Sequence, residues 1–229
     1  MGRLGYRLFE SDIDLDLASD VDDIILVRNG SESLRFSHIL DQSDLFDPSL
    51  AQDYYQIEEY RLEVEKIIIT IRNHLDSGLG DKLFDKYRTK ENDFLGQYRV
   101  VLVGALMMMA GAEIKKEHVQ HLRDLVPHID CHHGYTLPFN DLGFRGPGKA
   151  QFLAALDNYQ PGTPRNYREP SCFHCGKVRA DLGKTLKECG RCRGAWYCGL
   201  DCQKAHWKLH KPFCKRRGES TGQFEFLNV

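Results

Sequence analysis

The residues best suited to chemistry in this sequence are cysteines near its C-terminal end. Seven of the eight cysteines of the 229-residue chain lie between residues 172 and 214. Together with one histidine they form four pairs, spaced C-x2-C, C-x2-C, C-x3-C and H-x3-C. The eight side chains are Cys172, Cys175, Cys189, Cys192, Cys198, Cys202, His210 and Cys214. Thiolates and imidazoles are preferred zinc ligands, so the set is sufficient for two four-coordinate zinc ions.

Zinc is favoured over the other uses of paired cysteines. Seven is an odd number, which leaves one cysteine over in any disulfide framework. The chain starts MGRLGYRLFE without an apolar signal region, so an intracellular, reducing compartment is expected, with cytoplasm and nucleus left open. A redox C-x2-C motif is disfavoured because no thioredoxin-like βαβ pattern surrounds either pair. So short a segment cannot easily build its own core, and metal binding would supply its folding energy.

The spacing also predicts local structure. Two cysteines separated by two residues can point both thiolates at one ion from a tight turn, and Gly176 suits such a turn because glycine tolerates positive φ. Gly190 and Gly194 predict a looser turn at the second pair. The C-x3-C and H-x3-C pairs are predicted to lie on one face of a helical turn, with Pro212 distorting or starting the last one.

The order and spacing of these residues resemble the MYND zinc finger from Cys172 to Cys214. Trp196-Tyr197-Cys198, Cys202-Gln203 and Trp207 extend the resemblance. As a whole, the chain resembles uncharacterised fungal-type MYND proteins.

The resemblance implies interleaved ligands, which spacing alone could not show. One zinc ion would be held by Cys172, Cys175, Cys198 and Cys202. The other would be held by Cys189, Cys192, His210 and Cys214. The family pattern selects His210 over His206, which is expected to be a solvated helix residue, and His174 is expected to be a bystander. Four protein ligands at each ion leave no open position, so a structural role is expected for both.

The resemblance further implies a zinc-binding protein-interaction module, and hence an adaptor rather than an enzyme. Gln203 and Trp207 stand at the positions of a peptide groove, which in some members takes proline-containing segments. The alternative is that Trp207 only caps the small core around the metal sites. A SET–MYND type of lysine methyltransferase is not expected, because the sequence lacks the N-H-[SC] and Pro-Asn segments of that class.

Charge divides unevenly along the chain and leaves a second partner class open. Residues 172–217 hold 12 Lys and Arg against 3 Asp and Glu, whereas residues 1–171 hold 19 against 28. A basic surface can attract nucleic acid through a salt-sensitive term that is blind to sequence. No recognition helix with base-reading spacing is visible, so nucleic acid is not favoured, and a partner of acidic or mixed character fits equally.

The remaining sequence predicts a mainly α-helical protein. Three prolines and a glycine mark residues 160–171 as a linker between a helical domain at 1–159 and the finger at 172–214, with 215–229 as a tail. Apolar periodicity predicts helices over about 53–76, around 83–87, over 97–111, 115–126 and 151–159. The apolar stretch at 97–111 is too short to span a membrane, so a buried core helix is expected and no membrane partner.

Two further polar clusters are not expected to bind a metal ion. The acidic stretch from Asp12 to Asp23 starts like a calcium loop, but Leu17 replaces the glycine of that loop, so a solvated loop or helix cap is expected. A second His/Cys cluster matches no metal-ligand framework and is expected to be ordinary histidines plus a free thiol. Its members are His118, His121, His128, Cys131, His132 and His133.

Overall fold

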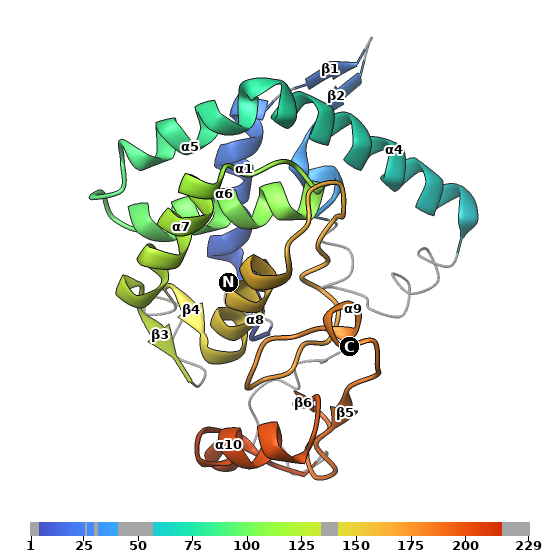
Figure 1. The fold of residues 1–229 in the computed structure, drawn as a ribbon, viewed down its shortest axis with the longest axis vertical. Coiled ribbons are helices and arrows are strands. Elements are labelled where there is room, and N and C mark those ends of the chain that lie inside the picture. The colour runs from blue at the N-terminus through green and yellow to red at the C-terminus, as the bar shows by residue number, and fades with distance from the viewer. Residues whose placement is uncertain (1–4, 26, 30–31, 41–56, 134–141, 217–229) are drawn as a thin grey trace. The chain divides into compact units, whose positions relative to one another are not determined.

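The computed structural model of the chain describes residues 5–25, 27–29, 32–40, 57–133 and 142–216 (Figure 1). Its contacts divide this part of the chain into two compact units. Unit 2 takes the residues between 9 and 129 together with 159–165, and unit 1 takes the rest. The chain crosses between the units after residues 8, 129, 158 and 165, so residues 130–158 group with the C-terminal segment and not with the helical domain expected at 1–159.

Unit 2 is helical, as the sequence predicts. The prediction for residues 53–56 lies outside the described part, and the helix is seen from Glu58 onward. Gly78, at φ 104°, breaks the helical conformation between the two successive helices predicted there. The elements of unit 2 are α1 (Asp12–Ile25), β1 (Val27–Asn29), β2 (Glu32–Leu34), η1 (Phe36–His38), α4 (Glu58–His74), η2 (Leu75–Leu79), α5 (Gly80–Arg88), α6 (Gly96–Ala110), α7 (Lys116–Leu125) and η3 (Val126–His128). The strands β1 and β2 pair antiparallel.

The core of unit 2 is built around α6, which contacts α1, α4, α5 and α7. Almost every residue of α6 is buried, including the three consecutive methionines at 107–109. The helix is apolar on all sides, which is the pattern of a helix surrounded by protein. Close packing also explains Gly104, where a Cβ atom would lie 2.5 Å from a methyl carbon of Leu122. The expected buried core helix is therefore confirmed.

The acidic opening segment forms α1 rather than a loop. The Ser11 hydroxyl accepts a hydrogen bond from the Asp14 backbone N–H at 3.1 Å, as in a helix N-cap. Asp14 itself is fully buried, and its carboxylate accepts hydrogen bonds from the Phe9 N–H at 3.0 Å and the Tyr98 hydroxyl at 2.8 Å. This carboxylate therefore joins α1 to α6, a role that the sequence analysis did not identify.

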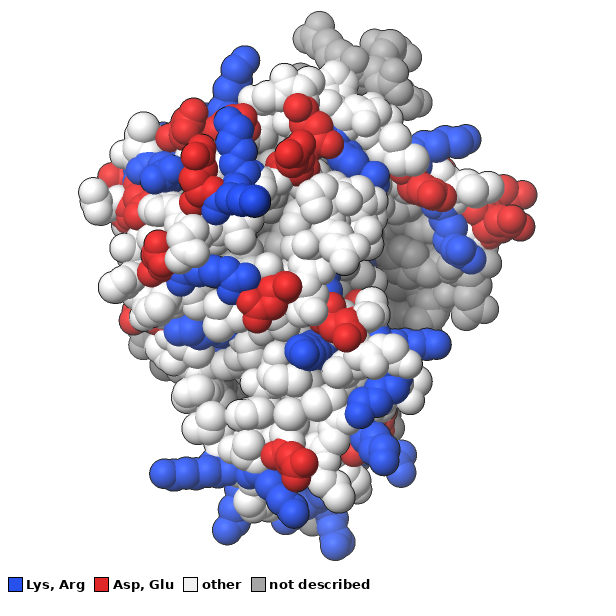
Figure 2. All heavy atoms as spheres, in the orientation of Figure 1, with Lys and Arg blue, Asp and Glu red and all other residues white. Residues whose placement is uncertain are grey.

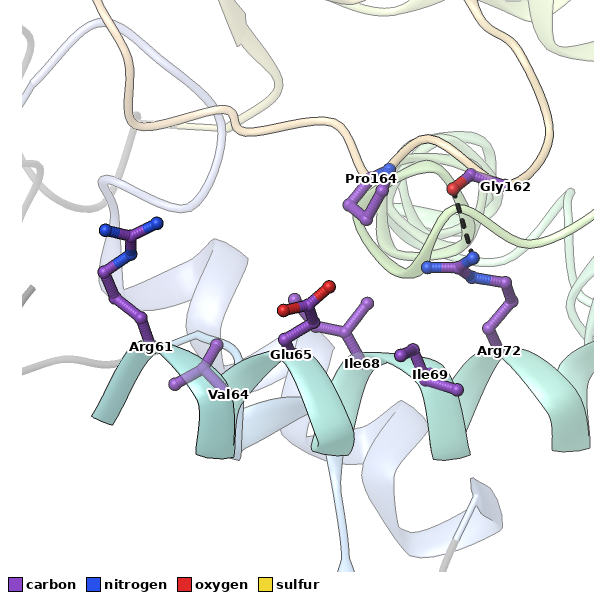
Figure 3. Close-up of a pocket in the computed structure, with 8 residues that line it drawn as sticks. All are labelled: Arg61, Val64, Glu65, Ile68, Ile69, Arg72, Gly162 and Pro164. Atoms are coloured by element: carbon purple, nitrogen blue, oxygen red, sulfur yellow. Dashed lines mark hydrogen bonds between the residues drawn. The ribbon is translucent and has the colours of Figure 1, made fainter. Parts of the chain in front are cut away.

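A groove with a volume of about 430 Å³ runs along α4 beside the segment 162–164 (Figure 3). Arg72 closes one end, where its Nε donates to the Ala110 carbonyl at 2.9 Å and its Nη1 donates to the Gly162 carbonyl at 3.1 Å. The Gly162 N–H donates in turn to the Gly111 carbonyl at 2.8 Å. One guanidinium thus ties α4, the end of α6 and the segment 159–165 together. The groove is lined by Arg61, Val64, Glu65, Ile68, Ile69, Arg72, Gly162 and Pro164.

Unit 1 combines one helix of the central sequence with the C-terminal segment. The helix expected at 151–159 starts earlier, at Gly146, and by its contacts it belongs to unit 1. The elements of unit 1 are β3 (Cys131–His132), β4 (Phe144–Arg145), α8 (Gly146–Asn158), α9 (Arg179–Leu182), β5 (Lys187–Glu188), β6 (Trp196–Tyr197), α10 (Leu200–His210) and η5 (Lys211–Phe213). β3 and β4 pair in parallel, and β5 and β6 pair antiparallel.

The mainly α-helical class is confirmed for the described residues as a whole. Among the described residues, no helix combines the length and the apolar character that crossing a membrane requires.

We predict that Arg72→Ala lowers the free energy of unfolding of unit 2 by about 2 kcal/mol, because two carbonyls lose a charged hydrogen-bond donor. Arg61→Ala is the matched control, since Arg61 lines the same groove on the same helix but is exposed. Urea denaturation followed by helical circular dichroism measures both. Equal stabilities of the two variants would contradict the role given to Arg72.

Candidate metal centre

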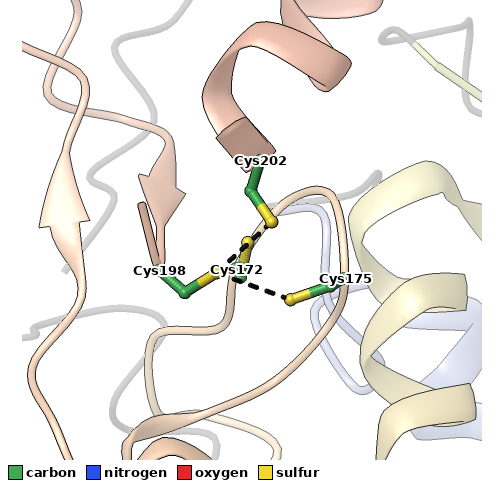
Figure 4. A group of neighbouring side chains, drawn as sticks. All are labelled: Cys172, Cys175, Cys198 and Cys202. Atoms are coloured by element: carbon green, nitrogen blue, oxygen red, sulfur yellow. Dashed lines mark hydrogen bonds between the residues drawn. The ribbon is translucent and has the colours of Figure 1, made fainter. Parts of the chain in front are cut away.

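The eight predicted ligands gather in two groups of four. In each group the ligand atoms all lie within 4.8 Å of one another. The first group comprises Cys172, Cys175, Cys198 and Cys202, whose sulfur atoms point toward a common centre (Figure 4). The second group comprises Cys189, Cys192, His210 and Cys214. The structure thus brings together the same interleaved sets that the resemblance implies.

Distances within the groups fit a tetrahedral ion. Zinc–sulfur bonds of about 2.3 Å place two sulfur atoms about 3.8 Å apart along the edge of a tetrahedron. The sulfur atoms of Cys175 and Cys198 are 3.8 Å apart, and those of Cys189 and Cys214 are 3.7 Å apart. These separations are far too long for a disulfide, and all eight cysteines of the chain are free.

The distance between a sulfur and a nitrogen ligand in the second group also fits a tetrahedral zinc ion. Sulfur and nitrogen ligands on one tetrahedral zinc ion are expected about 3.5 Å apart, because the zinc–nitrogen bond is shorter, at about 2.0–2.1 Å. Cys192 Sγ and His210 Nε2 are 3.5 Å apart. The edge between Cys198 and Cys202 is shorter, at 3.3 Å. The residues therefore fit two zinc ions, one in each group.

Backbone geometry at the two C-x2-C pairs repeats closely. The Gly176 N–H donates to the Cys172 carbonyl at 2.8 Å, and the Arg193 N–H donates to the Cys189 carbonyl at 2.9 Å. Gly176 has φ 72° and Arg193 has φ 56°, so both turns end in the left-handed region. Glycine occupies this position in the first turn, as predicted, whereas in the second turn it is occupied by an arginine and not by Gly190 or Gly194.

Electrostatics within the groups call for a cation. Burial alone would raise the pKa of Cys172, but backbone N–H groups donate to its sulfur and hold the pKa below its usual value. The pKa of Cys189 is lowered for the same reason. Burial raises the pKa of Cys175 to about 11 and that of Cys214 to about 12, and the neighbouring thiols add to both shifts. Zinc, as a divalent cation, would favour the thiolate form of every cysteine in both groups.

The last two ligand pairs are positioned differently from the prediction. Cys198 follows β6 and precedes α10, so it does not share a helical turn with Cys202, which lies in the first turn of α10. His210 is the last residue of α10, and the 3₁₀ turn η5, with Pro212 at its centre, carries the chain to Cys214. The prediction of a shared helical turn was therefore wrong for Cys198 and Cys202, whereas His210 and Cys214 are joined by the predicted distorted turn at Pro212.

His206 was expected to be solvated, and this expectation was wrong. Its side chain is only 8% exposed, and its Nδ1 lies 3.0 Å from the Tyr197 hydroxyl. Burial lowers the pKa of His206 to about 4, so the ring is neutral at neutral pH. Cys202, His206 and His210 share the inward face of α10, and the middle one packs against Tyr197 while the outer two belong to the ligand groups. His174 is exposed, as expected of a bystander.

The first ligand group is built against α8. Gly176, directly after Cys175, approaches the backbone of this helix so closely that a Cβ atom would lie 1.8 Å from the Ala150 carbonyl oxygen. Phe173, inside the same turn, packs on Tyr6 with ring centroids 5.5 Å apart. Segments distant in sequence therefore complete the surroundings of the first site.

The predicted peptide-binding residues lie on α10. Gln203 is half-buried, and Trp207 is 39% exposed with its ring centroid 5.9 Å from that of His210. One helical turn separates the two residues, so they share one side of the helix. Trp207 therefore both rests on a predicted zinc ligand and presents part of its ring to solvent.

The second His/Cys cluster does not form a metal site among the described residues. His118 stacks on Phe84 with ring centroids 4.3 Å apart, and His121 pairs with Glu91 at 2.6 Å. Burial raises the pKa of Cys131, which makes this thiol a poor nucleophile at neutral pH.

We predict that Gly176→Ala weakens zinc binding at the first group and leaves the second group intact. A left-handed alanine costs about 1–2 kcal/mol, and the overlap with Ala150 adds to this cost. Gly183→Ala is the matched control, because Gly183 has φ 63° but no atom within 4 Å of the place that a Cβ atom would take. Competition with a chromogenic chelator measures both zinc ions. Equal zinc affinities in the two variants would show that α8 does not support the first site.

Comparisons with known proteins agree with this geometry. Residues 172–214 match the family model of the MYND finger. A SET and MYND domain-containing protein of Dictyostelium discoideum is 50% identical over 46 residues, 19% of this chain and 8% of that protein. Histone-lysine N-methyltransferase ASHR1 of Arabidopsis thaliana is 35% identical over 81 residues, 30% of this chain and 16% of that protein.

N-lysine methyltransferase SMYD2 of Homo sapiens is 35% identical over 83 residues, 31% of this chain and 18% of that protein. The chain thus spans between 8% and 18% of the length of these three relatives. No solved structure matches the chain at a significant level. Residues 172–214 are therefore a MYND finger, a zinc-binding module of the protein-interaction type.

Proposed function

We propose that this protein is an intracellular adaptor whose MYND finger binds a peptide segment of a partner protein. The segment would lie on the side of α10 that carries Gln203 and Trp207, with proline-containing segments as the expected ligands. The zinc ions would hold this surface in shape and take no part in chemistry.

The proposal rests on the exposure and position of the Trp207 side chain. It is a large aromatic side chain, 39% exposed, on a helix with a predicted zinc ligand at each end. Its ring packs on that of His210 at a centroid distance of 5.9 Å, while part of the side chain stays open to solvent. A rigid aromatic wall of this kind suits extended or polyproline II segments.

The closed ligand groups support binding rather than catalysis. Each group offers four protein ligands, and catalytic zinc normally keeps one position for water or substrate. Some relatives are named as methyltransferases, but the similarity covers at most 31% of this chain and includes the finger. We therefore propose no enzymatic activity for this chain.

Nucleic acid is the second candidate partner, because the finger is basic. Lys and Arg outnumber Asp and Glu on the visible surface around α10 (Figure 2). Binding of this kind would weaken steeply with added salt, because it releases counterions from phosphates. A peptide contact centred on Trp207 would be much less sensitive to salt.

We predict that Trp207→Ala lowers the amount of partner protein recovered in a pull-down by at least tenfold, because the variant lacks the central aromatic side chain of the binding site. Leu209→Ala is the matched control, because Leu209 is equally exposed at 39% but two residues along the helix, and so on its opposite side. The measurement is a quantitative pull-down from cell extract with and without nuclease, at two salt concentrations. Partners that survive Trp207→Ala but vanish with nuclease would reject the peptide site.

A further inference from the structure

The exposed side of α10 carries a regular alternation of apolar and basic side chains. At 100° per residue, Leu200, Lys204 and Trp207 of α10 and Lys211, which directly follows the helix, fall within a sector of about 60° and form one stripe. Leu200 is 70% exposed and Trp207 is 39% exposed, and both lysines are exposed as well. The stripe is about 16 Å long, since its ends are eleven helical steps of about 1.5 Å apart. We refer to these four residues as the α10 stripe.

The lysines of the α10 stripe are not paired with carboxylates of the described chain. Within the described residues, no ion pair or side-chain hydrogen bond is formed by Lys204 or Lys211, nor by Lys208 beside them. Asp201 is the one acidic residue of the helix, and although it stands three residues before Lys204 it forms no ion pair with it. The ammonium groups of the stripe are therefore free of ion pairs within the described chain.

We propose that the α10 stripe selects peptide segments in which acidic residues flank apolar ones. This inference rests on the proposed function and adds the chemical class of the peptide. Apolar side chains of the ligand would cover Leu200 and Trp207, and carboxylates would pair with Lys204 and Lys211. An extended chain repeats its side chains on one face about every 6.6 Å, whereas neighbours in the stripe are about 4.5–6 Å apart along the axis, a difference that the long side chains of Lys204 and Lys211 can span.

The alternation favours an acidic peptide over a nucleic acid. A phosphate backbone supplies negative charge but no aliphatic side chain to cover Leu200, the most exposed large apolar residue of the finger. Sequence-tolerant binding of single strands uses several aromatic side chains in succession, whereas the stripe offers one. A peptide can satisfy both kinds of position at once.

The test is selection from a random 12-residue peptide display library on the zinc-loaded full-length chain. The variant is Lys204→Glu/Lys211→Glu. The control is Lys184→Glu/Lys187→Glu, which makes the same charge change at exposed finger residues outside α10. Zinc content is measured for every protein before selection. We expect the recovered peptides to be enriched at least threefold in Asp and Glu, with the enrichment kept in the control and lost in the variant.

Resynthesised peptides with Gln and Asn in place of Glu and Asp should bind at least tenfold more weakly. Peptides that depend on Trp207 but show no acidic enrichment would overturn this inference and leave the proposed function standing. Failure to recover any peptide that depends on Trp207 would overturn both. A 20-base-pair DNA duplex that binds more tightly than the best peptide, and loses binding with Lys204→Glu/Lys211→Glu, would assign the stripe to nucleic acid instead.

Discussion

The finger depends on one constraint, the gathering of eight ligands around two centres that share α10. Cys202 in the first turn of this helix belongs to one ligand group, and His210 at its end belongs to the other. Between them, His206 packs on Tyr197 in the small core of the finger. Two metal ions would therefore fix the helix at both ends, while Leu200 and Trp207 on the same helix stay exposed. Without the ions, few apolar residues hold the helix in place.

Residues outside the finger also pack against it. Gly176 meets the backbone of α8, and Phe173 packs on Tyr6, so the first ligand group is surrounded by segments from three parts of the chain. Gln151 of α8 is fully buried and donates to the Tyr167 carbonyl just before the finger. These contacts explain why α8 groups with the finger and why the segment before Cys172 is ordered by packing as well as by its prolines.

The sequence predicted the features that local patterns determine. Eight ligands in pairs predicted two zinc ions, because metal coordination restricts both residue type and spacing. The unbroken apolar run at 97–111 predicted a buried helix, and α6 is one. The burial of His206 was missed although a signal was present, since positions 202, 206 and 210 share one helical face. The spacing of four residues between His206 and His210 also made both of them candidate zinc ligands, so it did not by itself predict that the side chain of His206 is buried.

Contacts between residues that are distant in the sequence could not be predicted from local patterns. The buried carboxylate of Asp14 has its hydroxyl partner 84 residues away, at Tyr98, and the closeness of Gly176 to Ala150 links positions 26 residues apart. The interleaving of the ligand pairs followed from the family resemblance, because spacing alone allows several pairings.

The central claim is that metal binding folds the finger and fixes α10. Hydrogen exchange of the full-length chain, followed by mass spectrometry before and after chelation, tests it most directly. We predict that backbone amides in residues 172–214 lose their protection when zinc is removed, whereas those of α6 keep theirs. Protection of α10 that persists in the fully chelated protein would contradict the claim, because the helix would then be held by packing alone.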